Sequence, residues 1–192
     1  MSSTKASPLT RSFITLFAIG GVIWFGASIA RYVVAFDAFM PGTVEFKPSH
    51  TEETRIGIIW MFTLLGGWTG WSFVATVIGA VGIAVKTMHR WKSEGWMFIC
   101  AVLFILLAPA QGWMIWQDYG MWKLFNVGTG SPLAAPTEII AVFSRRITDV
   151  ASSIVNGLTF LSAITIIVLM IWKPLRLAAP QPTSANESQN ES

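Results

Sequence analysis

The sequence predicts an all-α membrane protein with four transmembrane helices, followed by a disordered C-terminal tail. Of the 192 residues, 53% are hydrophobic and only 12% are charged, a composition typical of chains embedded in a lipid bilayer. A helix needs roughly 20 apolar residues to cross a hydrocarbon core of about 30 Å. Four runs meet this length, residues 13–36, 56–85, 95–116 and 147–172. We expect them to form one domain over residues 1–173.

The first run has features of a signal peptide as well as of a transmembrane helix. Lys5 and Arg11 precede it, and residues 28–30 (SIA) resemble the small-x-small end of a cleavable signal peptide. The run nevertheless continues to Phe36, which makes it longer than a typical signal core. We therefore expect it to be kept as the first transmembrane helix, whereas cleavage would leave three.

Basic residues near the ends of the runs predict the orientation, because cytoplasmic loops are enriched in Lys and Arg. The clearest indicator is the short connection of residues 86–94 (KTMHRWKSE), which contains Lys86, Arg90 and Lys92. Such a compact basic loop is hard to translocate. We expect this loop and both termini to be cytoplasmic, and the two longer loops to lie outside.

The tail offers a direct test of this orientation. Residues 174–192 are polar and poor in large apolar side chains, so we expect them to be disordered. Asn186 and Asn190 both match the acceptor pattern for N-glycosylation. A cytoplasmic tail never meets the glycosyl transferase, so the chain expressed in a eukaryotic membrane system should carry no glycan there. Glycan on either asparagine, with the same sites modified in a control fusion, would invert the orientation.

Two helices are expected to extend beyond the membrane on the outer side. Ser49 and Glu52 have the spacing of a capping box, which predicts a second helix from near Ser49 to Lys86, about 55 Å long. Pro136 suits a first helical turn, and neither proline nor glycine interrupts residues 137–156. The fourth helix is therefore expected to run unbroken from Pro136, the alternative being a break near the membrane surface. We expect these extensions and the loop of residues 118–135 to form a small structured cap.

The stretch GGWTGWSF, residues 66–73, predicts how the second helix packs. Gly66 and Gly70 are four residues apart on one face, and small residues allow helices to approach closely in a membrane. Since Thr69, Ser72, Thr76 and Gly79 form a neighbouring stripe of small side chains, we expect this helix to be central. Trp68 and Trp71 are expected to fill gaps between helices; the alternative is an aromatic wall for a flat ligand such as a quinone, a pigment or a lipid headgroup.

The fourth helix carries a polar stripe within its apolar run. Its members recur at intervals of four and three residues: Arg145, Asp149, Ser152, Asn156, Thr159 and Ala163. This stripe should face protein or water. We expect Asn156 to form a hydrogen bond with Gln111 of the third run, where Pro109 also weakens the preceding helical turn.

The same stripe supports a second hypothesis, a hydrated cleft that opens outward. Ionisable residues near membrane depth are candidates for function. The candidate ligand or cleft residues are Arg31, Asp37, Gln111, Arg145, Asp149 and Asn156, with Arg146 also at the proposed mouth.

Motifs that carry catalytic chemistry are absent from the sequence. Cys100 is the single cysteine and cannot form an internal disulfide or a CxxC pair. His50 and His89 lie outside the apolar runs, on opposite sides in the expected orientation, so they cannot form the bis-histidine site of a b-type haem. The acids around His50 predict no metal site, because scattered acids in an exposed loop are usually solvated. A formal net charge of +3 spread over two membrane faces gives no basic stripe for nucleic acid.

These observations favour a protein without enzymatic activity. We expect an accessory or scaffold subunit of a larger membrane complex, in contact with the lipid bilayer and with other membrane subunits or with copies of itself. The first alternative is a small-solute channel or carrier that uses the stripe on the fourth helix. The second is an electron-transfer subunit that borders a quinone or pigment. No cofactor is predicted, although a quinone, lipid or pigment would fit the second alternative.

Overall fold

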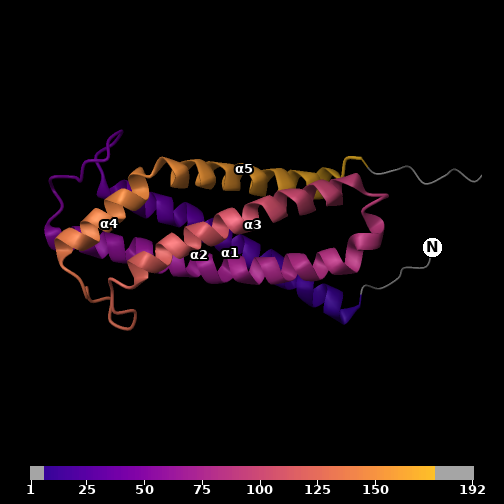
Figure 1. The fold of residues 1–192 in the computed structure, drawn as a ribbon, viewed down its shortest axis with the longest axis horizontal. Helices are drawn as coiled ribbons and strands as arrows, with labels where there is room; N and C mark the ends of the chain where they lie inside the picture. The colour runs from indigo at the N-terminus through magenta and orange to yellow at the C-terminus, as the bar shows by residue number, and fades with distance from the viewer. Residues whose placement is uncertain (1–6, 176–192) are drawn as a thin grey trace, which may run out of the picture.

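The computed structural model describes residues 7–175, and this part of the chain folds into five α-helices and one 3-10 turn (Figure 1). The elements are α1 (Pro8–Ala38), α2 (Glu52–Thr87), η1 (Met88–Arg90), α3 (Gly95–Trp122), α4 (Pro136–Thr148) and α5 (Val150–Trp172). Four of these helices, α1, α2, α3 and α5, are long and apolar enough to cross a membrane. The predicted all-α fold with four transmembrane helices is therefore confirmed. The expected disorder of the tail concerns mainly residues 176–192, which lie outside the described residues.

The bundle has two distinct ends. Both ends of the described chain lie at one of them, which we call the terminal end (Figure 1). The other, the loop end, carries α4 and the connections of residues 39–51 and 123–135. The orientation of these two ends across the membrane stays a prediction.

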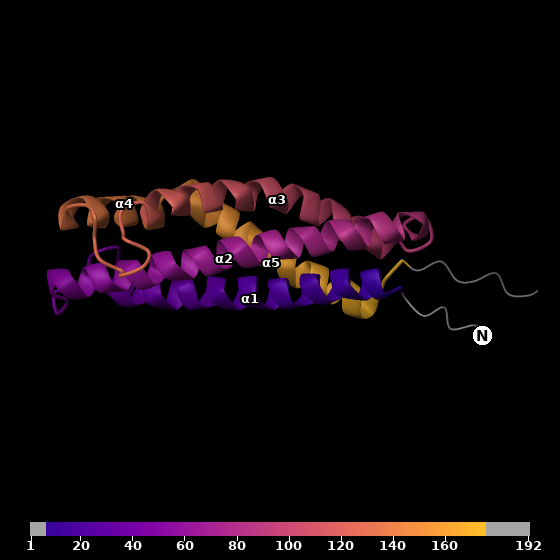
Figure 2. The same ribbon diagram turned by 90° about the horizontal axis from the view of Figure 1, so that it is seen from below.

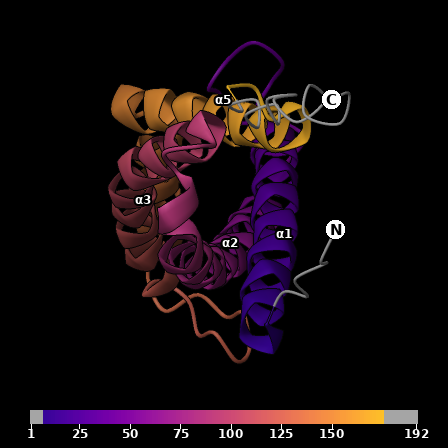
Figure 3. The same cartoon turned by 90° about the vertical axis from the view of Figure 1, so that its right-hand side faces the viewer.

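The four spanning helices form a ring in the order α1, α2, α3, α5 when viewed along the bundle (Figure 3). Helices α1 and α2 pack together over most of their length (Figure 2). By contrast, α1 and α5 meet mainly through aromatic rings. Phe160 of α5 contacts Phe25 and Tyr32 of α1, with ring centroids 5.3 and 5.9 Å apart. The seam between α1 and α5 is thus the loosest side of the ring.

The seam between α1 and α2 is close because small residues line it. Ser72 and Thr76 of α2 are buried, and their hydroxyls donate to carbonyls of their own helix. A Cβ placed at Gly79 would lie 2.5 Å from the backbone nitrogen of Phe17 in α1. The predicted stripe of small residues therefore faces α1, and Gly79 marks its closest backbone approach.

The residues singled out around GGWTGWSF have different surroundings from those expected. Gly66 and Gly70 are buried, but a Cβ at Gly66 would lie 3.2 Å from the Arg31 guanidinium carbon, and one at Gly70 would make ordinary contact with Ile115 at 3.7 Å. Neither glycine therefore marks a close backbone approach. Trp68 and Trp71 are 60% and 73% exposed, so they do not fill gaps within the bundle. At 100° per residue Trp71 lies on the side of α2 opposite its buried face, and Trp68 lies at the edge of that face, one turn before Ser72.

The loop end contains the predicted cap, with a hydrophobic core of its own. Rings of α1, α2 and α4 meet there: Phe39 stacks on Phe143 with centroids 5.7 Å apart, and Phe62 contacts Phe143 edge-on at 5.2 Å. The buried residues of this core are Ala35, Ala38, Phe39, Ile59, Phe62, Met121, Phe125, Ile139 and Phe143. The cap fastens the loop-end parts of α1, α2, α3 and α4 to one another.

The starting point of α2 differs from the prediction. Thr51 caps this helix, and its hydroxyl accepts a hydrogen bond from the backbone N–H of Thr54 at 3.2 Å. The capping box of Ser49 and Glu52 is not formed, because the helix begins three residues later than Ser49. The length of α2 nevertheless agrees with the predicted length of about 55 Å, since the helix has 36 residues, or about 54 Å.

The prediction of one unbroken fourth helix is wrong. The chain leaves helical geometry at Asp149, whose ψ angle is 114°, and α4 and α5 are separate helices. Asp149 caps α5, because its carboxylate accepts from the backbone N–H of Ser152 at 2.9 Å and from its hydroxyl at 2.5 Å. An aspartate can satisfy the free N–H groups of a new helix, so neither proline nor glycine is needed for the break.

The capping of the α5 N-terminus by Asp149 predicts a contribution to the free energy of unfolding that is lost in acid. Hydrogen bonds from Ser152 hold the pKa of the Asp149 carboxyl below its ordinary value of 3.8. Because the pKa is lower in the folded state, the ionised carboxylate contributes fully to stability at pH values above the pKa of the unfolded chain. This contribution is lost as the pH falls through the pKa of the folded state. We therefore expect wild type to have a higher thermal midpoint in detergent than Asp149→Asn at neutral pH, and the difference to shrink in acid. A difference that stays constant with pH would contradict this assignment.

Candidate functional site

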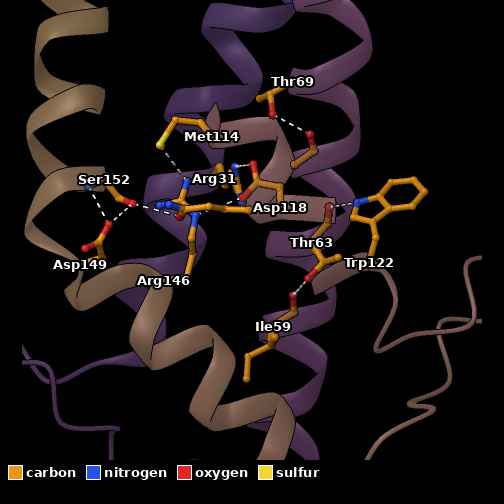
Figure 4. A network of polar contacts seen from close by, with 12 residues as sticks. Arg31, Ile59, Thr63, Thr69, Met114, Asp118, Trp122, Arg146, Asp149 and Ser152 are labelled. Carbon is orange, nitrogen blue, oxygen red and sulfur yellow. Dashed lines mark hydrogen bonds and ion pairs between the residues drawn. The ribbon is translucent and has the colours of Figure 1, made fainter. Parts of the chain in front are cut away.

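Three ionised side chains meet inside the bundle near its loop end (Figure 4). Arg31 of α1 donates to both carboxylate oxygens of Asp118 in α3, from Nη1 to Oδ2 and from Nη2 to Oδ1, each at 2.5 Å. Arg146 of α4 donates from Nε to Oδ1 of the same carboxylate at 3.2 Å. The three residues are only 9%, 6% and 8% exposed, respectively. We call them the ionic cluster, and it connects three helices.

The surrounding residues shape a space for the Arg31 guanidinium. Its carbon Cζ lies 3.9 Å from the centroid of the Phe62 ring, within range of a cation–π contact. Gly66, one turn further along α2, leaves room for the same guanidinium, as its missing Cβ would be 3.2 Å away. Gly66 therefore accommodates a charged side chain, which is a different role from the helix approach expected of it.

The ionic cluster lies close to the boundary between hydrocarbon and water. Helix α5 has 23 residues, or about 34 Å, little more than the hydrocarbon core of about 30 Å. Its first turn must therefore lie near the membrane surface. The hydroxyl oxygen of Ser152 in that turn lies 3.0 Å from the side-chain amide of Gln117, and Gln117 directly precedes Asp118. Beyond this level the cap lies outside the hydrocarbon.

A cavity of about 270 Å³ adjoins the ionic cluster, and we call it the loop-end cavity. Two deeply buried groups in its lining have atoms without a hydrogen-bond partner among the described residues, Nε of Arg31 and Oε1 of Gln111. The lining combines polar and aromatic side chains: Ser28, Arg31, Tyr32, Phe36, Phe39, Phe62, Gln111, Arg146, Ser153 and Asn156.

Three of the six predicted cleft residues line this cavity, namely Arg31, Gln111 and Asn156. The hydrogen bond expected between Gln111 and Asn156 is not formed, since Oε1 of Gln111 has no partner in the described part of the chain. Both side chains instead border the same space, one from α3 and one from α5.

The other three predicted residues lie elsewhere. Asp149 caps α5 next to the ionic cluster, and Asp37 forms an exposed ion pair with Lys47 at 2.6 Å. Arg145 is exposed and takes no part in the cluster. The predicted polar stripe placed Arg145 on the same face as Asp149, which requires one continuous helix. The break at Asp149 changes which residues of α4 share a face with those of α5. As a result Arg146, rather than Arg145, points inward.

Asp118 was not among the predicted site residues, although the sequence contains a signal for it. It lies seven residues after Gln111, and both belong to one buried face of α3 together with Leu107, Met114 and Met121. A spacing of seven brings two residues to the same side of a helix. The polar pair within an apolar face is the pattern that would have identified it.

The ionic cluster has more positive than negative charge. Two guanidiniums share one carboxylate, which leaves a net charge of +1. Burial lowers the pKa of the Arg146 guanidinium below its ordinary value, and the Asp118 carboxylate opposes that shift. Arginine stays protonated in proteins at neutral pH. Asp149 forms no ion pair with either arginine within residues 7–175, but it lies close enough to Arg146 for the two charges to attract one another.

A second cavity, of about 280 Å³, lies towards the terminal end and is lined almost wholly by apolar side chains. Cys100 is part of its lining and is half-buried. Within residues 7–175, no three His, Cys, Asp or Glu side chains are placed to share a metal ion. At the terminal end, Glu94 is a buried charged residue that pairs with Arg90 at 2.5 Å, whereas the loop-end cavity adjoins the three residues of the ionic cluster.

Comparisons of this chain with models of protein families, with curated proteins and with solved structures find no match. Its function must therefore be argued from the fold and from the geometry of the site.

Proposed function

We propose that this integral membrane protein binds a ligand without transforming it, and that the loop-end cavity holds an anionic group of that ligand. The observation that carries the proposal is the surplus positive charge of the ionic cluster beside a cavity. An anion in this space would neutralise the second guanidinium, which Asp118 alone cannot do. This proposal follows the earlier hypothesis of an outward cleft; it keeps Arg146, adds Asp118, and leaves out Arg145 and Asp37.

The hydrogen-bonding groups around the cavity support an anionic ligand. The Nε–H of Arg31 is buried and has no partner among the described residues. It is a donor, and a guanidinium has no acceptor. A buried donor without a partner is costly, so a phosphate or carboxylate that accepts from it would be bound favourably. Such charge-assisted hydrogen bonds are about twice as strong as neutral ones.

A binding function also fits the residue types present. The lining offers guanidiniums, amides and hydroxyls and holds neither histidine nor cysteine among its described members, and the Ser152 hydroxyl, which is hydrogen-bonded to the Asp149 carboxylate at 2.5 Å, belongs to the N-terminal capping of α5. The proposed role is therefore recognition of the ligand, as in a carrier or a sensor.

The proposal can be tested with butyl phosphate as a soluble probe. A ligand that binds only the folded state raises its thermal midpoint, which can be followed through the ten tryptophans in detergent solution. We expect butyl phosphate to raise the midpoint in a saturable manner, and butyltrimethylammonium to leave it unchanged at equal ionic strength.

Two neighbouring variants on α5 locate the effect. Ser153 is exposed at the edge of the cavity, so Ser153→Trp should obstruct it and weaken the response. Ile154 is 57% exposed and is not part of the lining, so Ile154→Trp is the matched control. An equal response in both variants would place the anion elsewhere. No response in wild type would leave the ionic cluster with a structural role only and overturn the proposal.

The predicted role as an accessory or scaffold subunit is a second candidate, which the exposed tryptophans favour. Tryptophan is enriched at the membrane interfaces, yet Trp68 and Trp71 lie two and five residues beyond Gly66, which borders the Arg31 guanidinium, and so about 3 and 8 Å deeper along α2 than the ionic cluster. Large exposed rings at that depth suit contact with another membrane protein. Purification in mild detergent with mass measurement tests this role, and a monomer without co-purifying proteins would contradict it.

A further inference from the structure

Resting on the proposed anion site, we infer that the ligand is a membrane amphiphile, a lipid with a phosphate or carboxylate headgroup in the leaflet at the loop end. It would reach the cavity sideways, through the seam between α1 and α5. Three independent features of the structure support this inference: the depth of the cavity, the position of its opening and its size.

The depth of the cavity matches that of lipid headgroups. The ionic cluster lies at the level of the first turn of α5, near the boundary of the hydrocarbon. Cavity residues continue from there towards the membrane centre, to Asn156 one turn further along α5 and to Ser28 one turn before Arg31 on α1. Lipid phosphates and carboxylates occupy this interfacial layer, so the anionic group needs no transfer across the hydrocarbon.

The opening of the cavity includes the seam between α1 and α5, which faces the lipid. The exposed residues at its edge are Phe36 of α1, which is 73% exposed, Ser153 of α5, and Thr43 and Val44 of the loop of residues 39–51. Phe36 and Ser153 lie on the two helices of the loosest seam, opposite the close contact of α1 with α2 (Figure 3). Towards the membrane centre, Phe160 closes the same seam against Phe25 and Tyr32. The lateral entrance is therefore confined to the headgroup layer.

The size and lining of the cavity indicate what enters it. A volume of about 270 Å³ is below the usual range of roughly 300–1,000 Å³ for sites that enclose a whole small molecule. A headgroup fits, while the acyl chains remain in the bilayer. Phe36 and Phe39 provide apolar contacts beside the charges, which a free inorganic anion would not use. A neutral quinone or pigment would leave the surplus charge of the ionic cluster unpaired.

The experiment compares two lipids that differ only in the anionic group. Native mass spectrometry measures how much dioleoyl phosphatidic acid and dioleoylglycerol the detergent-purified protein retains. Hydrogen bonds to a charged group change affinity roughly 10- to 100-fold, so we expect at least about tenfold greater retention of phosphatidic acid. Ser153→Trp should abolish most of this preference, and Ile154→Trp should keep it. Inorganic phosphate, added at the concentrations used for butyl phosphate, should not raise the thermal midpoint.

The outcomes separate this inference from the proposed function. If butyl phosphate stabilises the protein but phosphatidic acid is retained no better than dioleoylglycerol, the site takes a solute and the lipid inference fails alone. Equal stabilisation by inorganic phosphate and butyl phosphate would lead to the same conclusion. If the preference for phosphatidic acid is unchanged in Ser153→Trp, the lipid binds elsewhere, for example to the basic loop of residues 86–94, and the inference also fails. If neither butyl phosphate nor phosphatidic acid binds, both proposals fail.

Discussion

We expect Asp118→Asn to cause one of the largest losses of stability of any conservative substitution in this protein. The change keeps the size of the side chain but removes the negative charge shared by Arg31 and Arg146, which are 9% and 8% exposed. Removing one partner of a buried ion pair typically costs about 3–5 kcal/mol, because an uncompensated charge remains buried. The thermal midpoint in detergent should fall accordingly.

Two further variants test whether this loss comes from the buried charges. Asp37→Asn makes the same chemical change in the exposed ion pair with Lys47, where such pairs contribute little, so its midpoint should stay close to that of wild type. The double variant Asp118→Asn, Arg146→Gln removes one of the two unpaired guanidiniums. It should be more stable than Asp118→Asn alone. A double variant that is less stable still would show that the packing of Arg146 matters more than its charge.

The second large effect is expected at the seam between α1 and α2. In Gly79→Ala the new methyl group would lie 2.5 Å from the backbone nitrogen of Phe17 and 2.8 Å from its Cα. Backbone atoms cannot rotate away as a side chain can, so the two helices must separate along the contact. Overpacking of this kind typically costs about 1–3 kcal/mol.

Gly57→Ala is the matched control in the same helix, because a Cβ at Gly57 meets nothing within 4 Å. Alanine favours a helix by about 1 kcal/mol over glycine, so this variant should be as stable as wild type or more so. The measurement is again the thermal midpoint in detergent. Equal midpoints for Gly79→Ala and Gly57→Ala would mean that α1 and α2 are not held at this distance.

Local sequence patterns were sufficient for the number of spanning helices and for the existence of the cap. Apolar runs of about 20 residues have few structures open to them in a bilayer, because every backbone polar group must be satisfied within the segment. Helix ends were harder to predict. Asp149 suits both a polar helix surface and a helix cap, and only its hydrogen bonds with Ser152 decide between them.

The site residues could be predicted only in part, because their positions depend on helix ends and helical register. Arg31, Gln111 and Asn156 were conspicuous as polar residues in or beside apolar runs, and all three line the loop-end cavity. Arg145 and Arg146 are adjacent, and choosing between them requires the helical register on both sides of the break. Asp118 lies near the end of an apolar run. A charged residue is expected there, at the membrane surface, so its charge alone does not identify it as a site residue.

The sequence by itself thus determined the environment of this protein and the set of helices, since both depend on the hydrophobicity and length of continuous segments. Only the tertiary structure decided which side chains meet. Arg31, Asp118 and Arg146 come from α1, α3 and α4, and Asp118 is 87 and 28 residues away from its two partners. Contacts across such separations depend on how the helices rotate and cross. Those rotations are set by the packing of all the helices together, and no local pattern contains them.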